Sequence, residues 1–209
     1  MLYRIVKRVF DLFLSVILWV ITSPLMLLIS IVVKLSDGGE VFVGTPVRYG
    51  LNGKSFFMYK FRTMVPNAHG VAMGSREMRE NLLSNHKLEG DTRVTKVGKF
   101  LRGTDLDELP QLINVILGDM SLVGPRPYYD DEIKYHLERY PEDVKYFNDI
   151  FKVKPGITGI WQVSGRNEIP FKKRLQMESY YALNQCILND IYILLKTPFV
   201  VITRRGVAK

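Results

Sequence analysis

The feature that most constrains this chain is an uncharged apolar run near its N-terminus. It reads LFLSVILWVITSPLMLLISIVV, from Leu12 to Val33. Its length falls within the roughly 17 to 25 residues that cross a bilayer as a helix. A cleaved signal peptide would have an apolar core of about 7 to 15 residues and a cleavage site of small residues. The run has neither property and therefore predicts a membrane helix.

Two features bear on how this helix sits in the membrane. Pro24 lies at its midpoint, where it removes a backbone hydrogen bond and should bend the helix. Basic residues lie on both sides of the run: Arg4, Lys7 and Arg8 before it and Lys34 after it. Both ends therefore look cytoplasmic by the positive-inside rule. A re-entrant helix-break-helix is favoured, and a spanning helix with a proline kink is the alternative.

Charge and composition narrow the partners and the metal chemistry. The formal net charge of +8 indicates an anionic partner, which could be nucleic acid, an acidic membrane surface or a phosphorylated substrate. Cys186 is the single cysteine and lies in an apolar stretch, so we expect it in the core. The three histidines are not spaced as metal ligands, so any metal would be held by oxygen atoms.

The rest of the chain predicts a small α+β domain over residues 37–209, after a membrane segment over residues 1–36. Residues 40–64 contain two strand-like runs around Asn52 and Gly53, a pair that favours a tight hairpin turn. Lys60 and Arg62 follow on the second strand and share one of its faces. They could serve a ligand or simply face solvent.

Later segments have the composition of amphipathic helices. One carries a basic stripe beside apolar residues, with Arg93, Lys96, Lys99 and Arg102 at intervals of three. Residues 171–202 alternate charged positions with long apolar runs. Helices lying at the membrane interface fit this composition. The basic stripe also suits phosphates, and a solvated basic face is its simpler explanation. Ordinary core helices fit the last stretch equally well.

The stretch RGTDLDELPQ places three carboxylates, Asp105, Asp107 and Glu108, directly before a proline. Proline fits without cost only in the first turn of a helix, so a helix should begin near these acids and end at Gly118. Carboxylates are stabilised at a helix N-terminus, where they can cap the helix. They would also lie close to a bound phosphate or divalent cation. Capping alone remains the alternative.

Two further motifs follow. In VGPRP, Pro125 and Pro127 hold Arg126 in an extended backbone, which suits a guanidinium that binds phosphate with both of its edges. In VKPGITGIWQVSGRN, residues 153–167, several glycines precede an apolar run and Arg166.

With these motifs in view, the chain resembles the small monotopic phosphoglycosyl transferases, a family of bacterial sugar transferases. The resemblance runs from KRVFDLFLSVILWVITSP through KFRTM, LDELPQLINVILGDMSLVGPRP and PGITGIWQVSGRN to the C-terminal helices. It implies transfer of a sugar 1-phosphate from a UDP-sugar to polyprenyl (undecaprenyl) phosphate, with release of UMP. This reaction starts a surface glycan at the cytoplasmic face of the bacterial inner membrane.

The resemblance also implies roles for individual residues. Asp107 and Glu108 match the catalytic pair, with Mg²⁺ at Asp107 and a covalent aspartyl phosphosugar as intermediate. Ser23 and Pro24 match the break in the membrane helix. Substrate contacts are implied at Lys60, Arg62, Arg102, Arg126, Gln162 and Arg166.

The resemblance has limits and rivals. Asp105 stands where the family usually has Ser, and Glu178 where it has Asp. Nucleic acid is not implied as a partner, whereas later glycosyltransferases of the same pathway are candidate partners. The alternative function is a membrane-tethered basic binding protein without catalytic activity. A two-carboxylate glycoside hydrolase is disfavoured, because its acids should stand about 5 to 9.5 Å apart across a sugar.

Overall fold

A computed structural model of the chain describes residues 2–44, 47–83 and 91–203. Its α-helices are α1 (Leu2–Asp37), α2 (Ala68–Gly74), α3 (Arg76–Leu83), α4 (Lys96–Thr104), α5 (Gln111–Leu117), α6 (Asp130–Arg139), α7 (Val144–Ile150), α8 (Ile160–Ser164), α9 (Phe171–Leu183) and α10 (Ile187–Thr203). Its strands are β1 (Phe42–Val43), β2 (Arg48–Tyr49), β3 (Ser55–Phe56), β4 (Lys60–Phe61), β5 (Ser121–Val123) and β6 (Gly156–Thr158). Short 3-10 helices are η1 (Leu51–Gly53), η2 (Leu106–Glu108), η3 (Pro141–Asp143) and η4 (Arg166–Glu168).

The fold is helix-rich, and its short strands form pairs. β1 pairs antiparallel with β4, β2 antiparallel with β3, and β5 parallel with β6. The predicted hairpin is present, because η1 joins β2 to β3. Asn52 and Gly53 in this turn have φ values of 57° and 68°, a backbone conformation that these two residue types adopt readily. Contrary to expectation, Lys60 is not on the second strand of this hairpin, because it lies on the separate strand β4, which pairs with β1, and Arg62 follows that strand.

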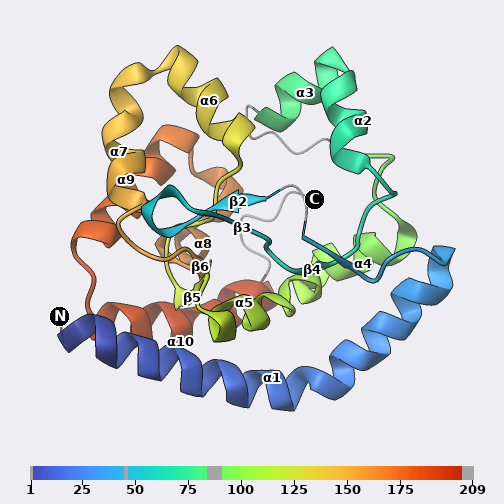
Figure 1. Ribbon diagram of the computed structural model, residues 1–209, viewed down its shortest axis with the longest axis horizontal. Helices are drawn as coiled ribbons and strands as arrows, with labels where there is room; N and C mark the ends of the chain where they lie inside the picture. The colour runs from blue at the N-terminus through green and yellow to red at the C-terminus, as the bar shows by residue number, and fades with distance from the viewer. Residues whose placement is uncertain (1, 45–46, 84–90, 204–209) are drawn as a thin grey trace.

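The predicted helix-break-helix is instead one continuous helix, α1, with Pro24 inside it. Proline has no N–H to donate to the carbonyl of Val20, one turn earlier. The Ser23 hydroxyl donates to this carbonyl at 2.8 Å, so the lost bond is replaced and the helix continues. Figure 1 shows α1 curved, concave toward the rest of the molecule. A bend rather than a break is the usual response to such a repaired proline.

Both halves of α1 pack against the same domain. In the first half, Leu14 and Leu18 pack on the main core, which includes residues of α5, β5 and α10. In the second half, Met26, Ile29 and Val33 form a cluster with Phe61 of β4 and Leu101 of α4. The helix therefore lies along one side of the domain, as Figure 1 shows.

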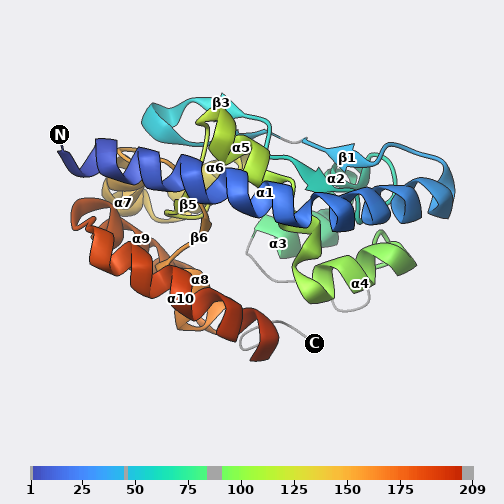
Figure 2. The same ribbon diagram turned by 90° about the horizontal axis from the view of Figure 1, so that it is seen from below.

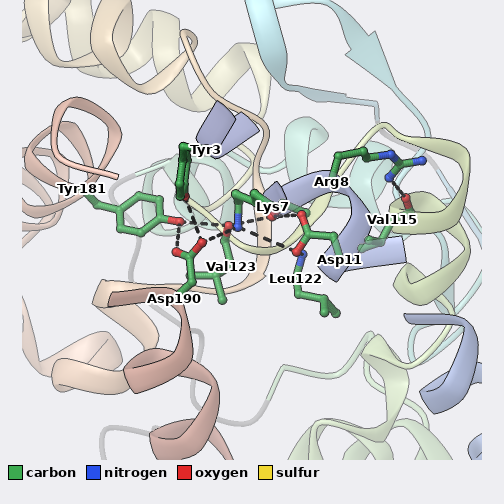
Figure 3. Close-up of polar contacts among 10 residues, drawn as sticks. Tyr3, Lys7, Arg8, Asp11, Val115, Leu122, Val123, Tyr181 and Asp190 are labelled. Carbon is green, nitrogen blue, oxygen red and sulfur yellow. Dashed lines mark hydrogen bonds and ion pairs between the residues drawn. The ribbon is translucent and has the colours of Figure 1, made fainter. Parts of the chain in front are cut away.

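Buried polar contacts hold the first turns of α1 in place (Figure 3). Lys7 pairs with Asp190 of α10 at 2.8 Å. Asp11 accepts hydrogen bonds from Ser121 Oγ at 2.7 Å and from the Leu122 backbone N–H at 3.3 Å. Lys7, counted above as a flanking charge, is thus buried within the protein.

Arg8 is also used within the protein. Its guanidinium donates to the carbonyls of Val115 and Ile116 at 2.6 and 2.9 Å, at the C-terminal end of α5. These carbonyls lie in the last turn of α5, where the negative end of the helix dipole favours a cation. The basic flank before the apolar run therefore serves mainly to attach α1 to the domain.

Many apolar side chains of α1 are exposed, among them Phe13, Val20 and Leu27. Figure 2 shows α10 and α4 on one side of α1. Exposed apolar side chains on α10 include Leu188, Leu195, Phe199 and Ile202, and α4 adds Phe100. Within the described ranges, α1 over Leu2–Ser36 is the one helix long and apolar enough to cross a membrane.

Two sequence expectations are corrected near these helices. Cys186 is exposed rather than buried in the core, because it lies in the loop between α9 and α10. Arg93 precedes α4 and pairs with Asp91 at 2.7 Å, so it is not part of the basic stripe on that helix. Lys96, Lys99 and Arg102 do lie on α4 and are exposed.

Candidate functional site

The acidic stretch forms a tight turn between α4 and α5. Asp105 adopts a left-handed conformation with φ of 56°, and η2 then carries Asp107 and Glu108. The predicted α-helix begins later than expected, at Gln111, with Pro110 just before it. Two backbone hydrogen bonds close the turn: the Glu108 N–H donates to the Asp105 carbonyl, and the Leu109 N–H donates to the Leu106 carbonyl. The predicted end at Gly118 is confirmed, since this glycine caps α5 with φ of 97°.

The turn packs directly against the apolar helix α1. Leu106 and Leu109, on either side of the acidic pair, pack against the cluster that contains Met26, Ile29 and Val33 of α1. The position of α1 therefore sets the position of Asp107 and Glu108 relative to any membrane in which α1 is embedded.

The two adjacent carboxylates have different environments. Asp107 is 6% exposed, and burial raises the pKa of this carboxyl to about 6. Lys60 and Arg102 oppose the rise in pKa, and the Glu108 charge adds to it. Burial would also raise the pKa of Glu108, but its salt bridge to Lys60, at 2.5 Å, acts together with the charges of Arg126 and Arg166 to lower that pKa. Glu108 is therefore a firmly ionised, paired carboxylate, whereas Asp107 titrates near neutrality.

The structure brings four of the sequence-predicted basic residues around this pair. Lys60 and Arg102 act electrostatically on Asp107, and Lys60, Arg126 and Arg166 act on Glu108. Arg62 is placed differently: it is buried with its guanidinium against Gly39, just after α1. A Cβ on Gly39 would come within 2.4 Å of that guanidinium.

Three glycines bring the two later motifs together. β5 leads into VGPRP, and its parallel partner β6 leads into α8. A Cβ on Gly156 would lie 2.0 Å from the backbone nitrogen of Gly124, and one on Gly159 would lie 2.2 Å from the Gly124 carbonyl oxygen. Only glycine allows this approach. Arg126 and the segment that begins at Trp161 thereby become neighbours, with the Arg126 guanidinium 5.6 Å from the Trp161 ring.

Polar atoms without hydrogen-bond partners gather on these two segments. Four buried atoms have none: Nε of Arg126, Nε1 of Trp161, Oε1 of Gln162 and Nε of Arg166. Such atoms are costly unless a ligand or water pairs with them. Three of the four belong to residues predicted from sequence. Trp161 was not predicted, although its place next to Gln162 in the same motif was a signal.

The two positions that depart from the family pattern both make contacts here. Asp105 pairs with Arg166 at 2.9 Å. Glu178 is 1% exposed and accepts hydrogen bonds from the Arg126 backbone N–H at 3.0 Å and from the Tyr128 hydroxyl. Glu178, which is one methylene longer than Asp, therefore holds the backbone of Arg126 in place.

Behind Glu178, sequence reasoning missed a buried network. Arg174 donates to the Tyr128 hydroxyl at 3.0 Å and to Glu132 at 3.1 Å. The only local signal was the presence of Arg174 and Glu178 at i and i+4 on an otherwise partly apolar segment. That spacing suggests an exposed pair, whereas both residues are buried and both bind Tyr128.

The residues at the turn are compatible with a magnesium ion held jointly with a substrate. Within the described residues, no three His, Cys, Asp or Glu side chains form a ready metal cage. Mg²⁺ is often held by one or two carboxylates together with substrate phosphates and water. Asp105 and Glu108 are engaged by Arg166 and Lys60, which leaves the Asp107 carboxylate as the best-placed protein ligand.

Comparison with known proteins identifies the family. The family model described as bacterial sugar transferase matches residues 2–204. The undecaprenyl-phosphate galactose phosphotransferase of Salmonella typhimurium is 46% identical, over 97% of this chain and 42% of that protein. The exopolysaccharide production protein ExoY of Sinorhizobium fredii is 41% identical, over 96% of this chain and 87% of that protein.

A third relative is the UDP-glucose:undecaprenyl-phosphate glucose-1-phosphate transferase of Escherichia coli, 37% identical over 94% of this chain and 40% of that protein. The chain thus spans less than half the length of the Salmonella and Escherichia proteins and most of the Sinorhizobium protein. The match to the family model and to ExoY covers nearly all of the present sequence. The chain therefore belongs to the bacterial sugar transferase family, as its motifs predicted.

Proposed function

We propose that this chain transfers a sugar 1-phosphate from a UDP-sugar to polyprenyl (undecaprenyl) phosphate, in two steps. The names of the relatives from Salmonella and Escherichia support the lipid acceptor, and the latter name also supports a UDP-sugar donor. The observation that carries the proposal is the buried Asp107, ringed by basic groups on a turn that packs against the membrane helix. The basic groups would bind the substrate phosphates, and the apolar helix would bring the site close to a lipid acceptor in the membrane.

In the first step, an Asp107 carboxylate oxygen attacks the phosphorus that carries the sugar. The bond from that phosphorus to UMP breaks, and UMP leaves with the bonding electrons. In the second step, a phosphate oxygen of the lipid attacks the same phosphorus, and the Asp107 carboxylate leaves. A carboxylate needs no base to activate it, which suits a nucleophile whose pKa of about 6 leaves it ionised at neutral pH.

The surrounding residues bind and orient the substrates in this proposal. Lys60 holds Glu108 ionised, and Arg102, Arg126 and Arg166 neutralise phosphate charge, which is the main catalytic requirement in such transfers. The unpaired buried atoms of Trp161 and Gln162 would bond to polar groups of the donor.

Asp107 and the substrate phosphates would hold Mg²⁺ in the same proposal. When bound, the ion would supply positive charge to the phosphates. It would also lower the pKa of Asp107, because a nearby cation favours the carboxylate.

The membrane arrangement is part of the proposal. Residues 1–36 would form a re-entrant anchor and residues 37–209 a catalytic domain at the cytoplasmic face of the bacterial inner membrane. The docking of both halves of α1 on one domain and the exposed apolar side chains of α1 and α10 support this arrangement. The name of ExoY supports a role in exopolysaccharide production, with later glycosyltransferases as candidate partners.

The test is a covalent adduct together with an exchange reaction. Enzyme mixed with Mg²⁺ and a panel of UDP-sugars, without lipid, should gain the mass of one sugar phosphate on Asp107. It should also exchange labelled UMP into the matching UDP-sugar. Asp107→Asn removes the anionic nucleophile, so adduct and exchange should fall to background. Asp149→Asn on α7 makes the same chemical change in a pair with Lys152 and should leave both intact.

Two outcomes would contradict the proposal. Exchange that requires the lipid acceptor, with no adduct, would mean direct transfer in one step. No turnover with any UDP-sugar would favour the membrane-tethered basic binding protein.

A further inference from the structure

Asn114 on α5 is buried and binds a segment that is distant in sequence. The residue is 0% exposed. Its Oδ1 accepts a hydrogen bond from the Tyr59 backbone N–H at 2.9 Å, and its Nδ2 donates to the Phe57 carbonyl at 2.7 Å. Nδ2 also faces Asp119 Oδ2 at 3.4 Å. The side-chain amide is used as both donor and acceptor, which the similarly shaped Asp cannot reproduce when it is ionised.

The segment that Asn114 holds leads directly into Lys60. Residues 57–59 lie between β3 and β4, and the ladders described for these strands do not include them. On the other side of this segment, β4 pairs with β1 through Phe42↔Phe61 and Val43↔Lys60. The bonds from Asn114, together with the burial of Met58 in the main core, fix the backbone just before Lys60.

These contacts form a closed circuit that begins and ends at the acidic turn. Glu108 binds Lys60, Lys60 follows Tyr59, and Tyr59 is held by Asn114. Asn114 in turn lies on α5, the helix that follows η2 and Glu108. Residues 108–114 thus carry both the Glu108 carboxylate and Asn114, which holds the segment that leads into Lys60.

We infer that Asn114 is a positioning residue that holds Lys60 against Glu108 and close to Asp107 during phosphosugar transfer. This inference rests on the proposed function, in which Lys60 controls the charge of the acidic pair. Loss of the hydrogen bonds from Asn114 would let Lys60 move while the Asp107 carboxylate stays in place. A displacement of about 1 Å at such a site is enough to slow a reaction substantially.

A double-mutant cycle tests this inference. Full-length wild type, Asn114→Ala, Lys60→Met and the double variant are compared by kcat/KM for UMP formation and by thermal midpoint. Asn114→Ala should lower kcat/KM by about tenfold or more, because Lys60 is no longer held in place beside the acidic pair. Lys60→Met should cost more, and the double variant no more than Lys60→Met alone, because no lysine is then left to position. Asn114→Asp keeps an acceptor for Tyr59 and should show the same non-additivity if the Ala variant does not fold.

Ser179→Ala provides the control for a purely structural loss. Ser179 is buried and donates a hydrogen bond to Asp149 at 2.8 Å, on α9 and α7 respectively. Its effect on kcat/KM should be small and should multiply with that of Lys60→Met. If the Asn114 variants also multiply with Lys60→Met, the inference is wrong. Absence of UMP formation in the wild type would instead overturn the proposed function, and this inference with it.

Discussion

At the scale of single residues, the central feature is the contrast between two adjacent carboxylates. Asp107 and Glu108 are neighbours on one tight turn, yet burial raises the pKa of Asp107 while Lys60 lowers that of Glu108. Different pKa values for paired acids commonly mark different chemical roles. Here they favour Asp107 as the group that changes its bonding and Glu108 as a permanently charged partner.

The pH dependence of activity should report the Asp107 carboxyl. Its raised pKa means that the reactive carboxylate is present above pH about 6 and is lost as the pH falls through that value. We expect kcat/KM at low Mg²⁺ to drop about tenfold per pH unit below this point. Lys60→Met removes a charge that lowers the Asp107 pKa. The acid limb of the pH profile, where kcat/KM falls, should therefore move to higher pH. Glu108→Gln removes a charge that raises the same pKa, so the limb should move to lower pH.

A matched control separates this electrostatic effect from general damage. Lys152→Met removes another lysine from an exposed ion pair with Asp149 and should leave the limb where it is. If the acid limbs of the Lys60→Met and Glu108→Gln variants move in the same direction, the limb does not report the Asp107 carboxyl.

At the scale of elements, α1 combines a proline with its own repair. Pro24 removes the N–H that would reach the Val20 carbonyl, and the Ser23 hydroxyl supplies the missing donor. In apolar surroundings an unpaired carbonyl is costly, so the Ser-Pro pair allows a bend without an unsatisfied group. The helix can therefore curve around the domain while remaining continuous.

The repair predicts that Ser23 matters only when Pro24 is present. Ser23→Ala should destabilise the protein in nanodiscs by about 1–3 kcal/mol, because the Val20 carbonyl loses its donor. Pro24→Ala restores a backbone N–H and should straighten α1, so adding Ser23→Ala to it should cost little. Ser30→Ala is the control, since Ser30 donates to Met26 in a proline-free part of the helix. Equal effects of Ser23→Ala with and without Pro24, measured by thermal unfolding, would refute the repair.

At the scale of the whole molecule, the attachment of α1 argues for a helix that does not cross the bilayer. Its first turns are joined to α10 by the buried Lys7–Asp190 pair, and its second half packs on Phe61 and Leu101. Breaking a buried ion pair costs about 3–5 kcal/mol, so the first attachment resists separation. A straight spanning helix would carry one end about 30 Å away from the domain that holds the other.

Both ends of α1 should therefore be reachable from the same side of the membrane. Cys186 is exposed and must first be replaced by Ser. Arg4→Cys and Ser36→Cys then place single thiols near the two ends of the helix, at exposed positions. In intact cells, neither thiol should react with an impermeant maleimide, whereas both should react in inside-out vesicles. Labelling of either thiol from outside intact cells would contradict the re-entrant arrangement.

Several parts of the fold and site could be predicted because their causes are local. The apolar run predicted the long apolar helix α1, Asn52 and Gly53 predicted the hairpin turn, and Gly118 predicted the end of α5. The acidic stretch was found because three carboxylates before a proline are unusual within a basic chain. Each of these signals depends only on residues that are close in sequence.

Other features depended on contacts between distant segments and had no local signature. Lys7 and Arg8 looked like flanking charges, yet they make specific contacts with Asp190 and with the end of α5. The continuity of α1 likewise followed from a hydroxyl that repaired the proline, and not from the proline itself.

The sequence by itself determined that this chain has a long apolar helix, a hairpin and an acidic turn beside basic motifs. Run length, turn residues and helix-ending residues act within a few positions and leave a readable pattern. Only the tertiary structure decided which basic groups surround Asp107, that Glu178 supports Arg126, and that Asn114 holds the segment before Lys60. These pairings join residues far apart in the chain, and they exist because core packing and close glycine contacts bring their segments together.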